Sequence, residues 1–172
     1  MSAPFALRPA VRADLPDIVR LTRGLAEYEH LAHEFTATEA TFERLLFSAD
    51  RLAEAVLADI PGQPPVGIAL FIRIVHTFRG YVGLFLEDLF VEPAHRGRGI
   101  GKALLRHLAV TATERGYHWV EWSVLDWNEP SIQFYEKLGA TRVEGWHTRR
   151  LTGEALTALA LAALAKGAST HG

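Results

Sequence analysis

The spacing of apolar and polar residues divides the chain into strands and helices. Strand-length apolar runs predict strands at residues 5–10, 52–58, 66–76, 83–91, 117–124 and 141–151. Apolar residues three and four positions apart predict helices that begin near Asp14, after a capping box at 36–39, near Ile100 and at Pro130. Gly24 is a weak point in the first helix, where it could bend or break. Gly116 and Gly139 are expected to end the last two of these helices.

A further helix is predicted over residues 153–166. It is rich in alanine and leucine and has almost no polar face. A helix of this kind is buried or covered by another subunit, so we expect a homodimer.

A glycine-rich stretch, Arg96–Lys102, follows the strand at 83–91 and opens the helix near Ile100. Such a loop exposes main-chain N–H groups where the helix dipole is positive, which favours an anion such as phosphate. A Walker A loop is excluded because Arg96 stands at its first glycine and Ala103 replaces its hydroxyl. A dinucleotide fingerprint is excluded because Lys102 stands where its third glycine is needed. A tight turn without a ligand remains the alternative.

Composition narrows the class of protein. The 172 residues, 49% of them hydrophobic and 22% charged, predict a single folded domain over residues 1–172. A net charge of -2 argues against nucleic acid, and the absence of cysteine excludes disulfides and thiolate chemistry. The histidines form no HExxH pattern, so no metal is predicted. With no signal-like start and no membrane-length apolar run, we expect a cytoplasmic protein without a membrane partner.

Two motifs resemble those of a known family. Arg96-x-x-Gly99-x-Gly101 resembles the pyrophosphate loop of the Gcn5-related N-acetyltransferases (GNAT), which use acetyl-coenzyme A. Residues 128–140 resemble their second signature, an asparagine followed by a helix that ends in Phe-Tyr-x-x-x-Gly. Segments 25–29, 86–91, 127–131 and 144–146 most resemble the diamine (spermidine/spermine) and thialysine acetyltransferases, whereas 36–80 matches poorly. The resemblance implies an α+β fold of three layers, with a mixed, mostly antiparallel sheet flanked by helices.

The resemblance also implies a coenzyme site. Main-chain groups after the middle of the strand would pair with the pantetheine amides, and the glycine loop would bind the pyrophosphate. The residues assigned to the coenzyme in this way are Leu89, Phe90, Val91, Arg96, Gly97, Arg98, Gly99, Ile100, Gly101, Lys102, Asn128 and Ser131.

Acetyl transfer to an amine needs a base and an acid. An alkylammonium has a pKa of about 10.4 and must lose a proton before it attacks. Glu87 and Asp88 interrupt an apolar strand, where carboxylates are costly unless they are paired or used. The resemblance makes Glu87 the base, directly or through water, and Tyr135 the acid at the sulfur. Asp88 then lies on the other face or is re-aimed by a bulge, and a salt bridge to a core arginine is an equal alternative. For Tyr135 the alternative is ordinary packing on the sheet.

The acceptor is predicted to be a small cationic amine, either a diamine, a polyamine or a thialysine-like amino acid. Carboxylates and aromatic faces suit such a ligand. The positions that match the family's acceptor site are Tyr28, Glu29, Glu87, Asp88, Glu144 and Trp146, and each could instead be a surface charge or a packed ring. The polyamine enzymes of the family have a denser acidic stretch after the Tyr-Glu pair, where this chain has His30, Ala32 and His33. A protein N-terminal or lysine acetyltransferase and a non-catalytic acyl-coenzyme A-binding regulator remain alternatives.

Overall fold

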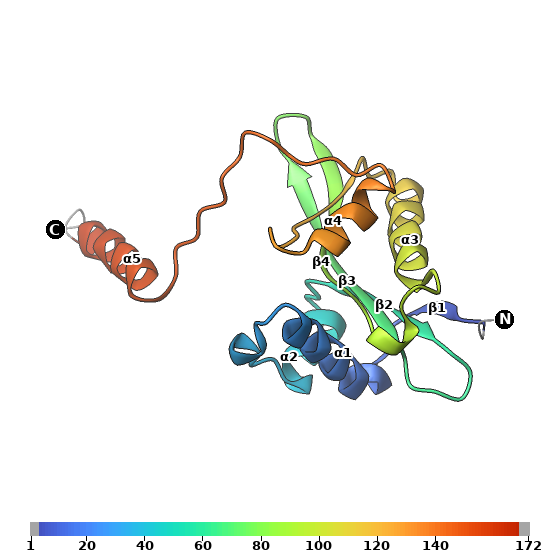
Figure 1. The fold of residues 1–172 in the computed structure, drawn as a ribbon. Helices are drawn as coiled ribbons and strands as arrows, with labels where there is room; N and C mark the ends of the chain where they lie inside the picture. The colour runs from blue at the N-terminus through green and yellow to red at the C-terminus, as the bar shows by residue number, and fades with distance from the viewer. Residues whose placement is uncertain (1–3, 169–172) are drawn as a thin grey trace. The chain divides into compact units, whose positions relative to one another are not determined.

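The computed structural model describes residues 4–168, which form one five-stranded sheet and five α-helices (Figure 1). The strands are β1 (Ala6–Pro9), β2 (Glu54–Asp59), β3 (Gly67–His76), β4 (Tyr81–Val91) and β5 (Val120–Trp122). The helices are α1 (Leu15–Tyr28), α2 (Glu39–Phe47), α3 (Ile100–Glu114), α4 (Glu129–Glu136) and α5 (Gly153–Ala168). The chain divides into two compact units, one that ends at Asn128 and one that begins at Glu129, and each is described by itself.

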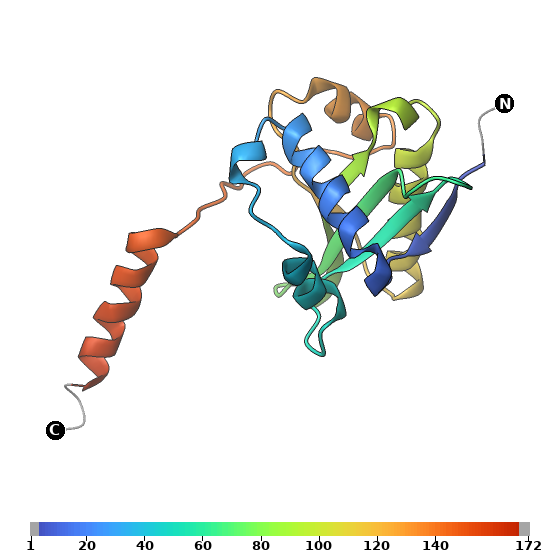
Figure 2. The ribbon, with the colours of Figure 1, turned by 90° about the horizontal axis from the view of Figure 1, so that it is seen from below.

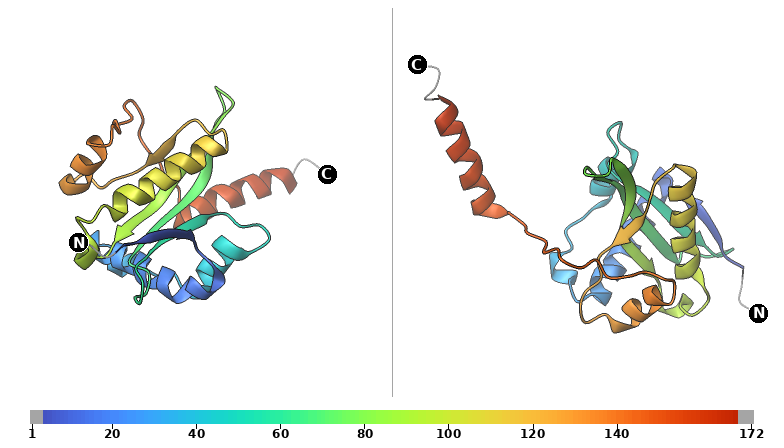
Figure 3. Two further views of the ribbon diagram at one scale, coloured as in Figure 1. Left: turned by 90° about the vertical axis from the view of Figure 1, so that its right-hand side faces the viewer. Right: turned by 90° about the horizontal axis from the view of Figure 1, so that it is seen from above.

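The sheet of the first unit runs in the order β1-β2-β3-β4-β5. The first four strands pair antiparallel, and β5 pairs parallel with β4. Helices α1 and α2 cover one face and α3 covers the other, as Figures 2 and 3 show for this unit. The mixed sheet between helical layers confirms the predicted α+β class.

The alternation of the strands supplies a core on each face. On the side of α1 and α2, Ile18, Leu21 and Phe42 pack with Leu57 and Ile68 of the sheet. The intervening strand residues face the other way and are buried too, which is why the strands read as continuous apolar runs. The buried stripe that α3 brings to this second face consists of Ile100, Leu104 and Leu108.

Helix α1 forms where it was predicted, but the roles of Gly24 and Asp14 differ from the prediction. Helix α1 continues through Gly24, where a Cβ would lie 2.9 Å from the Phe90 ring, so this glycine makes room for packing and does not break the helix. Asp14 precedes α1 as predicted, but its carboxylate accepts hydrogen bonds from Arg8 instead of capping the helix. The Arg8 guanidinium holds the pKa of Asp14 below its ordinary value.

The cap of α2 and the last predicted strand are corrections. The N-cap is Thr38, whose side chain accepts from the Thr41 N–H, so the capping box starts two residues later than predicted. Residues 141–151 form no strand. Gly145 has φ +81, outside the extended region, and the sheet ends at β5 within residues 4–168. A strand pattern needs a partner for its main-chain groups, and none is present in the described chain.

Helix α5 forms where its alanine and leucine content predicts it. Its Leu156, Leu159 and Leu161 are exposed. The homodimer therefore stays a prediction. No helix among residues 4–168 is both long and apolar enough to span a membrane.

Candidate active site

A β-bulge in β4 sets the position of the two central carboxylates. Opposite β3, Leu70 pairs with Asp88 and Phe71 pairs with Leu86, so Glu87 is the extra residue. Paired residues share a face of the sheet, and Leu70 belongs to the core under α1. Asp88 is therefore turned to the α1 face, while Leu86 faces the other way. A bulge that re-aims Asp88 was one of the predicted alternatives.

Helix α1 brings a third carboxylate to this face of the sheet. Glu29 follows the last residue of α1, and burial raises its pKa above the ordinary value. Asp88 is half-buried, and its pKa is raised to about 6, first by burial and then by the negative charges of Glu87 and Glu29. Glu29, Glu87 and Asp88 together form the acidic cluster. A concentrated negative charge of this kind favours a cationic ligand.

The direction of the Asp88 pKa weakens the alternative of a salt bridge. An arginine beside Asp88 would lower its pKa, as Arg8 does for Asp14. The pKa of Asp88 is instead raised, first by burial and then by the negative charges of Glu87 and Glu29.

The end of α1 has an unusual conformation next to the acidic cluster. The Leu31 N–H donates to the Ala26 carbonyl and the His30 N–H to the Glu27 carbonyl, which is the Schellman pattern. His30 takes the left-handed position of this motif with φ 63, which glycine usually occupies. Its ring then lies 5.3 Å from that of Trp127.

Tyr28 connects the end of α1 to the end of the first unit. Its hydroxyl donates to Asn128 Oδ1 at 3.1 Å, and Asn128 is only 4% exposed. Its ring lies 6.2 Å from that of Trp127, which is half exposed. Sequence reasoning did not assign a role to Trp127 or His30. Trp127 lay within a family-like segment, whereas nothing in the sequence marks His30 as left-handed.

The glycine loop has the geometry of an anion site. Gly97 and Gly99 have φ +73 and +84, and nothing lies within 4 Å of where their Cβ atoms would be. Gly99 is the N-cap of α3 and has no side chain to cap it, while the Ala103 N–H donates to the Gly99 carbonyl. The earlier N–H groups of the first turn, from Ile100 to Lys102, have no partner within the helix. The loop therefore fits a pyrophosphate.

Among residues 4–168, no strand pairs with the outer edge of β4 beyond the bulge. The parallel ladder with β5 ends at the pair of Leu86 and Trp122. On the β3 side the Glu92 N–H donates to the Val66 carbonyl, so alternation turns the main-chain groups of Leu89 and Val91 to the outer edge. Peptide-like groups of a pantetheine chain fit such an edge.

The remaining predicted site residues lie in the second unit. Tyr135 is half-buried on α4, 5.3 Å from the Phe134 ring. Ser131 lies in the first turn of the same helix. Glu144 and Trp146 are exposed in the irregular segment after it. Their convergence with the acidic cluster stays a prediction.

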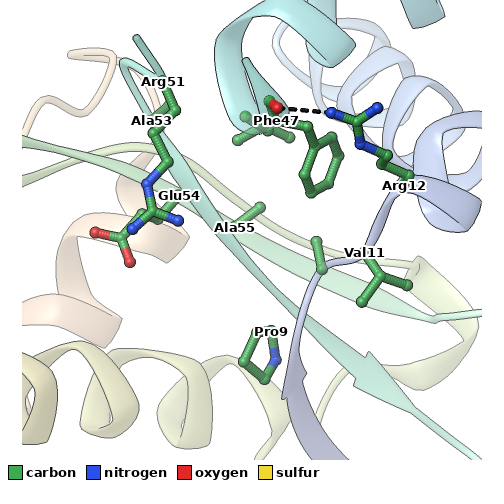
Figure 4. A pocket seen from close by; sticks show the side chains of 10 residues that line it. Pro9, Val11, Arg12, Phe47, Arg51, Ala53, Glu54 and Ala55 are labelled. Carbon is green, nitrogen blue, oxygen red and sulfur yellow. Dashed lines mark hydrogen bonds between the residues drawn. The ribbon is translucent and has the colours of Figure 1, made fainter. Parts of the chain in front are cut away.

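A separate surface groove of about 360 Å³ lies between α2 and the start of β2 (Figure 4). Two of its charged side chains bond within the protein. Arg12 donates to the Phe47 carbonyl at 2.8 Å, and Glu54 accepts two bonds from Arg115 at 2.6 and 2.7 Å. It contains none of the predicted site residues. Among residues 4–168, no three His, Cys, Asp or Glu side chains gather as a metal site would require.

Comparisons with known proteins indicate the family of this chain. The model of the acetyltransferase (GNAT) family matches residues 17–140. The thialysine N-epsilon-acetyltransferase of Sus scrofa is 35% identical, covering 92% of this chain and 98% of its own. The L-ornithine N5-acetyltransferase NATA1 of Arabidopsis thaliana is 30% identical, covering 89% and 86%. An integron cassette protein from the V. cholerae mobile metagenome shares the fold, with a TM-score of 0.76, 23% identity, and coverage of 92% of this chain and 99% of its own.

Enzymes of this family use acetyl-coenzyme A as their co-substrate, and the open β4 edge and the glycine loop fit its two parts. The family model covers most of the chain, including the bulged strand and the loop. The chain is therefore an acetyltransferase and belongs to the GNAT family.

Proposed function

We propose that this enzyme acetylates a primary amine of a small cationic acceptor, such as a diamine, a polyamine or a thialysine- or lysine-like amino acid. The observation that carries the proposal is the acidic cluster, in which Glu87 and Asp88 lie on the strand that leads into the glycine loop and Glu29 lies at the end of α1. An alkylammonium would relieve the mutual repulsion of these carboxylates. The printed names of the relatives, which act on thialysine and ornithine, support an acceptor of this class.

In this proposal the glycine loop and the end of β4 bind the coenzyme, and the carboxylates at the bulge bind the acceptor. The first-turn N–H groups of α3 hold the pyrophosphate, and the main chain of Leu89 and Val91 holds the pantetheine. Acetyl-coenzyme A supplies the acetyl group as a reactive thioester. Asp88 and Glu29 bind positive charge, and the exposed Glu87 takes the proton of the attacking amine, directly or through water.

Tyr135 is the proposed acid. A phenol with a pKa of about 10 can protonate a leaving thiolate. Asn128 and Ser131 are proposed to contact the coenzyme from the junction before α4 and from its first turn.

The test is an acceptor screen. Release of free coenzyme A is followed with putrescine, spermidine, thialysine, ornithine, and peptides with a free N-terminus or a lysine. We expect turnover with at least one small amine and none with peptides. Turnover with peptides alone would favour a protein acetyltransferase. Coenzyme binding without acetylation of any amine would favour a regulator. A cytoplasmic location and a homodimer remain predictions, and light scattering at micromolar concentration tests the dimer.

A further inference from the structure

The side chain of Arg96 contacts Tyr28 at the end of α1, a residue predicted to bind the acceptor. Its Nε donates to the Val91 carbonyl at 2.9 Å. Its guanidinium carbon lies 4.5 Å from the centre of the Tyr28 ring and 5.6 Å from that of Phe90. Tyr28 in turn donates its hydroxyl to Asn128. One side chain therefore joins the first residue of the glycine loop, the end of β4 and the end of α1.

These contacts indicate different roles for the main chain of the loop and for the Arg96 side chain. The guanidinium carbon lies over the Tyr28 ring, and one of the five N–H donors of the side chain is used by Val91. The main-chain N–H groups that follow Gly99 can bind the pyrophosphate without this side chain. The bond to Val91 also fixes the last main-chain carbonyl of β4.

The guanidinium also changes what Tyr28 can offer an acceptor. A cationic amine could stack on a free tyrosine ring, but Arg96 already lies over this one. Arg96 contacts the face of the Tyr28 ring, and Asn128 accepts a hydrogen bond from its hydroxyl. The ring therefore has a structural role. The acceptor's positive charge is left to the acidic cluster, where Glu29 is the residue next to Tyr28.

We propose that Arg96 is a positioning residue that acts through Tyr28 on acceptor binding, and that it does not bind the coenzyme phosphate through its side chain. Because Glu29 follows Tyr28 directly, loss of this contact removes one support of the α1 end that carries this carboxylate. The acceptor part of this proposal rests on the proposed function. The contact between Arg96 and Tyr28 does not.

The test compares full-length variants for two ligands. Arg96→Gln removes the charge, Arg96→Lys keeps it, and Arg98→Gln makes the same change two residues along the loop. Arg106→Gln is a matched change on the exposed face of α3. KM for acetyl-coenzyme A and for the amine is measured in each variant, and dissociation constants for coenzyme A, putrescine and L-ornithine are measured by calorimetry.

We expect Arg96→Gln to raise the acceptor KM about two- to fivefold, the size of an exposed cation–π contact, with the coenzyme KM within twofold of wild type. Arg96→Lys should restore much of the loss, and Arg98→Gln should weaken the coenzyme instead. A rise in the coenzyme KM alone for Arg96→Gln would overturn the proposal.

A double-mutant cycle tests the contact without any ligand. Arg96→Gln and Tyr28→Leu are combined, and the unfolding equilibrium is measured in urea. We expect the two changes to be non-additive by about two- to fivefold in the unfolding constant. Additive effects would overturn the inference even if no amine proved to be a substrate. A wild-type enzyme that acetylates no amine, with the coupling intact, would contradict the proposed function and leave the positioning of Tyr28 by Arg96 standing.

Discussion

Replacing Asp88 with asparagine should stabilise the protein at neutral pH and weaken acceptor binding. The pKa of Asp88 rises from an ordinary 3.8 to about 6, with burial as the first cause. Each pH unit corresponds to about 1.4 kcal/mol, so ionised Asp88 costs the folded state up to about 3 kcal/mol. The folded protein holds this proton more tightly than the unfolded chain does. Stability is therefore lost as the pH rises from about 4 to about 6.

The prediction is tested by urea unfolding of wild type and Asp88→Asn at pH 4.5 and pH 7.5. Asparagine cannot ionise, so the variant should gain up to about 3 kcal/mol relative to wild type at pH 7.5 and much less at pH 4.5. Comparing the two pH values cancels any change in packing. Asp50→Asn, a change at an exposed aspartate, should keep the pH dependence of wild type.

The same variant should bind putrescine more weakly, because it has lost one carboxylate of the acidic cluster. An equal stability change at both pH values would show that Asp88 titrates near its ordinary pKa. In that case the electrostatic reasoning about Glu29, Glu87 and Asp88 would be wrong.

Three further predictions concern the acid, the loop and the core. Tyr135→Phe should lower kcat at least tenfold while the affinity for coenzyme A stays within twofold, and unchanged turnover would remove Tyr135 from the acid role. Gly99→Ala should cost about 1–2 kcal/mol in urea unfolding because of its φ of +84, and should weaken coenzyme A in calorimetry. Gly62→Ala is its control, with similar strain at φ +77, and an equal loss of affinity there would contradict the loop assignment. Gly24→Val should destabilise by about 1–3 kcal/mol, because the Phe90 ring fills the space beside this glycine; a neutral result by thermal unfolding would refute that packing.

The confirmed predictions share a local cause. The helix ends at Gly116 and Gly139 could be read from the sequence because a Schellman motif needs a left-handed residue, which glycine takes at little cost. The glycine loop was predictable for the same reason. The segment 141–151 shows the limit, since a strand pattern forms a strand only where another strand supplies its partners.

The candidate site depends on contacts between distant segments more than the strands and helices do. Sequence reasoning placed Glu87 and Asp88 beside the coenzyme loop but left open which face each would take. The bulge decides this, and it is visible only in the pairing of β3 with β4. The stack of Arg96 on Tyr28 joins residues 68 positions apart, and no spacing rule predicts it.

By itself, the sequence determined the order of strands and helices up to α4, the glycine loop and the family, because these depend on periodicity, backbone freedom and motifs of neighbouring residues. Only the tertiary structure decided that Asp88 faces α1, that its pKa rises to about 6 and that Arg96 covers Tyr28. Burial, charge proximity and ring stacking are properties of distances between segments far apart in the chain, and folding alone sets those distances.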